Sequence, residues 1–64
     1  MNYEQVLQAL KDEKFVDVGG IWSFFGRAMG CGDGCCNDWH DTLEETAEMV
    51  IILADKSGNN ITVS

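Results

Sequence analysis

All three cysteines and the only histidine of this chain fall within residues 31–40, which read CGDGCCNDWH. Two spacings of four residues follow one another there, from Cys31 to Cys35 and from Cys36 to His40. Thiolate and imidazole are the donors that structural zinc sites prefer, usually four at a time and in tetrahedral geometry. Glycines alternate through the first half of the segment and permit tight backbone turns. The segment therefore predicts a closed structural Zn²⁺ site with the ligands Cys31, Cys35, Cys36 and His40.

Other arrangements of the same segment stay open. Adjacent cysteines bind one metal only with backbone strain, so Cys35 or Cys36 could instead point into the core as a small apolar residue. The fourth ligand would then be Asp33, Asp38 or water. The segment could also hold three reduced structural cysteines beside a surface histidine, or a short disulfide.

The length of 64 residues predicts a single domain, residues 1–64. A domain this short buries only about 60% of the surface that its unfolded chain exposes, and its stability is marginal. Chains of this size often depend on a metal, disulfides or a partner, which favours the zinc interpretation. Residues 1–14 lack the features of a signal peptide, and no apolar run is long enough to span a bilayer. We therefore expect a cytoplasmic protein with reduced thiols and no membrane association.

Eleven acidic residues stand against four basic ones, a formal net charge of −7. Nucleic-acid binding begins with neutralisation of phosphates by Lys and Arg, so direct binding of DNA or RNA is not expected. A basic protein partner is favoured because long-range attraction speeds the encounter of opposite charges. Plain solubility is the simpler explanation of the same charge.

The first half of the chain predicts a helix followed by a hairpin. Asn2 and Gln5 form a capping-box pattern at the start of a helix that should end near Glu13 or Lys14. Residues 15–18 and 21–25 are β-prone and flank Gly19-Gly20, a two-residue hairpin signal. This hairpin would pair Phe15 with Phe24 and Asp17 with Trp22. Residues 26–38 are expected to form a long loop that a bound metal supports.

The second half predicts a helix over residues 39–48, capped by Asp38, and then a hairpin of residues 49–54 with residues 61–63 at the sheet edge. Four acids recur at helical spacing within this helix and predict one continuous acidic stripe: Asp41, Glu44, Glu45 and Glu48. Leu43, Ala47 and Val50 fall on the opposite face. Like charges at these spacings cost a few tenths of a kcal/mol each, so the stripe is a candidate partner-binding surface as well as an ordinary solvated face.

Together these elements predict an α+β domain, a short antiparallel sheet with two helices on one face and a zinc-binding loop. The expected core residues are Leu7, Leu10, Trp22, Phe24, Val50 and Ile52.

Catalysis is not expected. Cys36 and His40 could form a nucleophile and its base, with Asp38 or Asp41 as the orienting group. A chain this short, however, has little room for a substrate pocket beside a core. A redox site would prefer the spacing C-x-x-C, which the sequence lacks.

In size, charge and the CGDGCCNDWH segment, the chain resembles the small acidic inhibitors of phages and mobile elements, and specifically a zinc-stapled type II-A anti-CRISPR protein. This resemblance implies a Cas9 partner in a bacterial host cell. It also implies interference with guide RNA loading, DNA binding or cleavage. The alternative is a structural zinc module that serves as an adaptor or small subunit of a protein complex.

Overall fold

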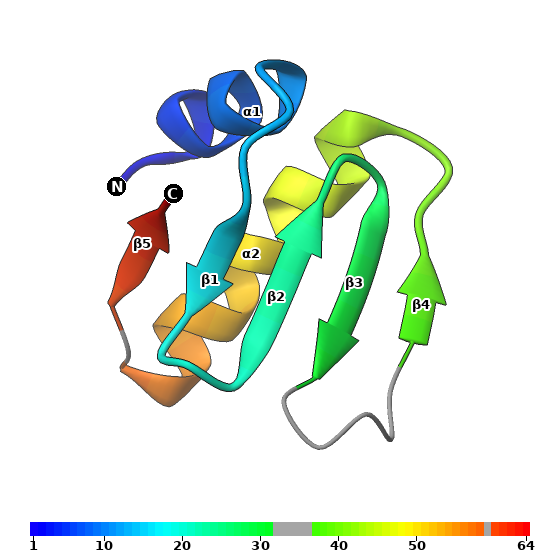
Figure 1. Cartoon of the computed structure of the whole chain (residues 1–64). Coiled ribbons are helices and arrows are strands. Elements are labelled where there is room, and N and C mark those ends of the chain that lie inside the picture. The colour runs from blue at the N-terminus through cyan, green and yellow to red at the C-terminus, as the bar shows by residue number, and fades with distance from the viewer. Residues whose placement is uncertain (32–36, 59) are drawn as a thin grey trace.

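A computed structural model describes residues 1–31, 37–58 and 60–64 of the chain. The elements in chain order are α1 (Tyr3–Lys11), β1 (Val16–Val18), β2 (Trp22–Phe25), β3 (Ala28–Cys31), β4 (Asn37–Trp39), α2 (Leu43–Ser57) and β5 (Ile61–Val63). The strands form one antiparallel sheet in the order β4-β3-β2-β1-β5. Figure 1 shows α2 running behind the sheet and α1 lying across the end where the chain termini meet. The predicted α+β class is confirmed.

The capping box at the start of α1 is confirmed. The Asn2 side chain accepts a hydrogen bond from the Gln5 amide at 2.9 Å, and the Gln5 side chain accepts one from the Asn2 amide at 3.0 Å. The helix ends at Lys11, slightly before the predicted end. Glu13 has a φ of 59°, and a left-handed residue at this position terminates a helix.

The hairpin of β1 and β2 forms where the sequence predicts it, but its register is shifted by one residue. Val16 pairs with Phe24 and Asp17 with Ser23. The shift arises because Ile21 belongs to the turn, where its amide donates to the Val18 carbonyl at 3.0 Å. The turn thus holds one residue more than the predicted two. Loop length fixes the register of a hairpin, and this register places Val16, Val18 and Phe24 on one face of the sheet.

The predicted long loop over residues 26–38 is wrong. Gly26 and Arg27 form a tight turn between β2 and β3, with Gly26 at a φ of 58° and Phe25 paired with Ala28. The sequence AMGC of β3 lacks the alternation of a typical strand. The polar strand β4 lies at the sheet edge with all its residues exposed. The residues of β3 and β4 are therefore strands because they pair with adjacent strands, and not because their own sequences favour a strand.

The start of the second helix also differs from the prediction. Trp39 pairs with Ala28, and the His40 amide donates to the Arg27 carbonyl at 2.9 Å. These residues are therefore tied to β3 and cannot begin a helix. Thr42 caps α2 instead of Asp38, accepting a hydrogen bond from the Glu45 amide at 3.1 Å.

The predicted strand over residues 49–54 is wrong, because α2 continues to Ser57 and ends at Gly58 in the left-handed conformation. The apolar run here is long enough to serve a helix, with Val50 on the buried side and Ile52 51% exposed on the other. The predicted hairpin with residues 61–63 is therefore absent from the described chain. β5 lies at the sheet edge as predicted, but it pairs with β1.

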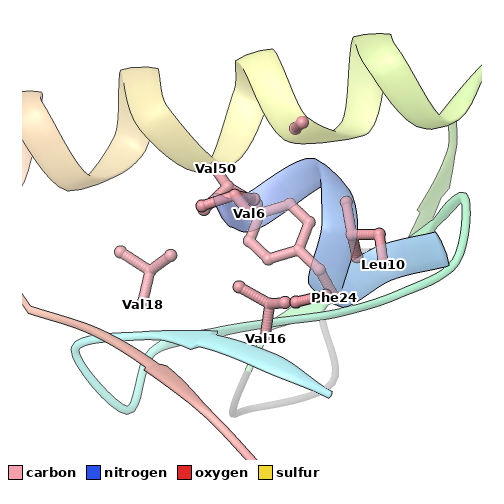
Figure 2. Packing of buried hydrophobic residues seen from close by; sticks show 8 residues of the cluster. Val6, Leu10, Val16, Val18, Phe24 and Val50 are labelled. Atoms are coloured by element: carbon pink, nitrogen blue, oxygen red, sulfur yellow. The ribbon is translucent and has the colours of Figure 1, made fainter. Parts of the chain in front are cut away.

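The core lies between the helices and one face of the sheet (Figure 2). Its buried hydrophobic side chains are Val6, Ala9, Leu10, Val16, Val18, Phe24, Ala47 and Val50. Of the predicted core residues, Leu10, Phe24 and Val50 are buried. Leu7 and Trp22 are half-buried against the cluster. The prediction for Ile52 is wrong, because this side chain faces outward. No helix in the described part of the chain combines the length and hydropathy that crossing a membrane requires.

Candidate functional site

The predicted acidic residues lie together at the start and along the outer face of α2. Glu44, Glu45 and Glu48 belong to the helix, and all three side chains are exposed. Asp41 is also exposed but precedes the cap residue, so it stands outside the helix that the sequence assigned to it. Its backbone amide donates to the Glu45 carboxylate at 3.2 Å, which keeps it beside the helical acids. These four residues are called the acidic stripe below.

The inner face of α2 explains why the stripe points outward. Thr46, Ala47 and Val50 are fully buried against the core. The Thr46 hydroxyl donates to the Thr42 carbonyl at 3.0 Å, so this buried polar side chain is satisfied within the helix. Because α2 is fixed by these contacts, residues on its other side are held at the surface.

The helix dipole affects the acids unequally. Glu44 and Glu45 lie in the first turn of α2, where the positive end of the dipole stabilises negative charge. Glu48 lies beyond the range of that effect. Mutual repulsion within the stripe is therefore only partly offset by the helix.

Tyr3 on α1 borders the stripe, a neighbour that the sequence analysis did not identify. Partial burial raises the pKa of the Tyr3 phenol above its usual value of 10.0, and the negative charges of Glu44 and Glu48 raise it further. The signal available in the sequence was the position of Tyr3 at the start of an amphipathic helix, but only the packing of α1 on α2 brings it to these acids.

Arg27 connects the sheet to the beginning of the stripe. Its guanidinium donates to the Asp41 carbonyl at 3.1 Å and lies 5.1 Å from the centre of the Trp39 ring. The contacts bring the turn between β2 and β3 against the segment that leads into α2. Sequence analysis gave Arg27 no role.

The predicted zinc ligands are only partly within the described residues. Cys35 and Cys36 lie outside them, as does the alternative ligand Asp33. Cys31 is the last residue of β3, whereas His40 is hydrogen-bonded to Arg27 at the other end of that strand. Four residues of strand span about 13 Å, and zinc bonds are only about 2.0–2.3 Å long. The described structure does not bring Cys31 and His40 into one coordination sphere.

No group of three or more potential metal-ligating side chains is found among the residues that the structure describes. The carboxylate of Asp38, another alternative ligand, accepts a hydrogen bond from the Trp39 amide at 2.8 Å and is exposed. The His40 Nε2 atom is buried and has no hydrogen-bond partner among the described residues. Zinc binding stays a prediction. The disfavoured pairing of Cys36 with His40 in a thiol enzyme is untested, because Cys36 lies outside the described residues.

Comparison of the chain with protein families, with curated proteins and with solved structures gave no match. The site is therefore interpreted from its own residues.

Proposed function

We propose that this protein binds a basic surface of a nucleic-acid-handling protein through the acidic stripe, and thereby blocks the loading or activity of that partner on nucleic acid. The observation that carries the proposal is the stripe itself: three exposed acids on a helix whose opposite face is buried, with exposed Asp41 held beside them through Glu45. Such a surface can meet several cations of one partner at once. The net charge of −7 adds long-range attraction to a basic partner.

Cas9 is the partner that the resemblance to type II-A anti-CRISPR proteins suggests, and it is the partner to test first. Within this proposal the protein acts as an inhibitor and not as an enzyme. Its negative surface would compete with the phosphates of guide RNA or target DNA for the same basic groove. The compartment in which it acts would be the cytoplasm of a bacterial host.

The test uses two variants of equal net charge. Glu44→Lys with Glu48→Lys reverses two charges in the stripe, and Asp12→Lys with Asp55→Lys reverses two exposed charges elsewhere. Each reversal adds two charges, so −7 becomes −3 in both proteins. Binding to purified Cas9, with and without guide RNA, is measured by biolayer interferometry over a range of salt concentrations.

The wild-type protein should bind, and its affinity should fall as salt rises because ions screen exposed charges. The stripe variant should associate at least about tenfold more slowly, since charges at an interface act mainly on the association rate. The control variant should keep most of the affinity. Equal losses in the two variants would show that only net charge matters, and wild-type binding by the stripe variant would place the interface elsewhere.

Structural zinc is a separate proposal that rests on donor chemistry alone. Thiolates bind zinc readily, and three cysteines fall within six residues at positions 31–36. The position of His40 at the far end of β3 does not support its role as the fourth ligand. Native mass spectrometry with and without chelator tests the proposal. A bound zinc that survives His40→Ala but is lost in Cys31→Ser supports cysteine ligation, and metal-free protein of unchanged thermal stability after zinc addition rules it out.

A further inference from the structure

The face of the sheet away from the helices carries a row of exposed aromatic side chains. Successive side chains of a strand point to opposite faces, so buried Phe24 places Phe25 on the open side. Phe25 pairs with Ala28, and Ala28 pairs with Trp39 on the next strand. Phe15, Phe25 and Trp39 therefore form one row across the sheet, and they are 55%, 42% and 64% exposed.

The row is partly preassembled. The rings of Phe15 and Phe25 lie 4.7 Å apart at an angle of 36°. Phe15 is held beyond the end of β1 by two backbone hydrogen bonds with Ser64, of 3.0 and 3.1 Å. Aromatic side chains fixed in this way lose little conformational freedom on binding, which favours their use as contact residues.

A groove lies beside the row. It has a volume of about 230 Å³, and its lining includes Phe15, Phe25, Ala28, Gly30 and Asn37. Ala28 and Gly30 lie on the open face of β3. Because these residues are small and the neighbouring Phe15 and Phe25 are large, a depression forms over β3. The volume of this groove suits one large apolar or aromatic side chain.

One cationic side chain, Arg27, lies directly beside this row, although the protein as a whole is acidic. The Arg27 guanidinium lies over the Trp39 ring and donates to the Asp41 carbonyl, and within the part of the chain that the structure describes it contacts no carboxylate. A second groove of about 540 Å³ is lined by Phe25, Trp39, Arg27 and Lys11, with Glu13 as its acid. Lys14 directly precedes Phe15 but lines a different groove, together with Asp12. Arg27 and Lys11 are therefore the basic residues that border the row.

We propose that the open face of the sheet binds an acidic peptide segment of a partner protein, one that carries an aromatic side chain next to its carboxylates. The aromatic side chain would enter the groove over Ala28 and Gly30, and a carboxylate would bind Arg27. Arg pairs with carboxylates through two parallel hydrogen bonds when its fork is free to do so. The inference does not depend on the acidic stripe, although Arg27 contacts the backbone of Asp41 at the beginning of that stripe.

Single-stranded nucleic acid also stacks on exposed aromatic side chains, but the charges here favour a peptide. A nucleic acid brings one phosphate per nucleotide to a protein of net charge −7, with Asp17 on the same open face. A short peptide can bring only the one or two carboxylates that the local cations can match.

The experiment is a titration of the ¹⁵N-labelled protein followed by NMR. The probes are acetyl-Asp-Trp-Glu-Ser-Phe-amide, its basic counterpart acetyl-Lys-Trp-Arg-Ser-Phe-amide, and a ten-nucleotide oligothymidylate. The acidic peptide should shift the amide signals of Phe15, Phe25, Ala28 and Trp39, and the two other probes should bind more weakly at this face. Trp39→Ala should weaken the acidic peptide about tenfold, as expected for a central aromatic contact, and Arg27→Gln should weaken it about threefold to tenfold.

Two matched variants serve as controls. Ile52→Ala removes an exposed apolar side chain from α2, and Lys56→Gln removes the basic residue that lies away from the row. Both should bind the acidic peptide as the wild type does. The proposal is overturned by equal binding of the acidic and basic peptides, by tighter binding of the oligonucleotide, or by shifts confined to other surfaces. At about 2 mM peptide, binding with a dissociation constant of about 1 mM would still shift the signals. Absence of any shift at this concentration therefore also overturns the proposal.

Discussion

The two outer surfaces of this small domain differ in chemistry and in how they arise from the sequence. The outer face of α2 carries the acidic stripe, four acids from one short segment. The open face of the sheet carries Phe15, Phe25 and Trp39, which come from three separate parts of the chain. The residues on one face of a helix follow from their spacing in one segment, whereas the residues on one face of a sheet depend on which strands pair and in what register. The acidic stripe could therefore be predicted from the sequence, whereas the aromatic row could not.

The largest effect should distinguish two neighbouring phenylalanines on opposite faces of β2. Phe24→Ala should destabilise the fold by about 3–5 kcal/mol, because it removes the largest fully buried side chain. Phe25→Ala should cost less than about 1 kcal/mol, since Phe25 is 42% exposed. Urea denaturation followed by circular dichroism measures both. Equal destabilisation would mean that the register, and with it the aromatic row, is misplaced.

A smaller effect should confirm which side of α2 faces outward. Val50→Ala should cost about 2 kcal/mol, because Val50 is fully buried. Ile52→Ala should change the free energy of unfolding by no more than about 0.5 kcal/mol, because this side chain is 51% exposed and alanine is a good helix former. The same denaturation experiment applies. A larger loss for Ile52→Ala than for Val50→Ala would favour the strand that the sequence alone predicts for residues 49–54.

The smallest effect reports directly on the electrostatics of the stripe. Tyr3 is the only tyrosine, so absorbance at alkaline pH follows its ionisation alone. Because the charges of Glu44 and Glu48 help to raise the pKa of Tyr3, Glu44→Gln with Glu48→Gln should lower it toward 10.0. Glu45→Gln is the matched control and should change it less. An unchanged pKa of Tyr3 in the double variant would show that the charges of the stripe do not affect this phenol.

The raised pKa of Tyr3 also gives the sign of a stability change. The folded protein favours the protonated phenol, so this contribution to stability is fully present below the unfolded-state pKa. It is lost as the pH rises through the higher folded-state pKa. Stability of the wild type should therefore fall more steeply above about pH 10 than that of the double variant.

The predictions from sequence succeeded where neighbours in sequence decide the structure. The capping box of Asn2 and Gln5 and a turn at Gly19-Gly20 are local signals, and the structure has both, although its turn also includes Ile21. The exposed acids of α2 follow from helical spacing in the same way. The predicted strand over residues 49–54 was wrong because an uninterrupted apolar run suits a buried strand or a helix equally well.

The unpredicted parts depend on contacts between residues far apart in the chain. β3 and β4 become strands through pairing, since AMGC and NDW carry little strand pattern of their own. The meeting of Tyr3 with Glu44 and Glu48 requires α1 to pack on α2. The predicted zinc ligation by Cys31, Cys35, Cys36 and His40 stays a prediction, because Cys35 and Cys36 lie outside the described residues.

The central claim is that the acidic stripe and the aromatic row are independent binding surfaces of one domain, although Arg27 beside the row contacts the Asp41 backbone. Binding of Cas9 and of the acidic peptide should be measured for three proteins: Glu44→Lys with Glu48→Lys, Trp39→Ala, and the combination of all three substitutions. We predict that the stripe substitutions weaken Cas9 binding alone, that Trp39→Ala weakens peptide binding alone, and that the combined variant shows the two losses added without interaction. Loss of Cas9 binding in Trp39→Ala, with the stripe substitutions having no effect on it, would contradict the account.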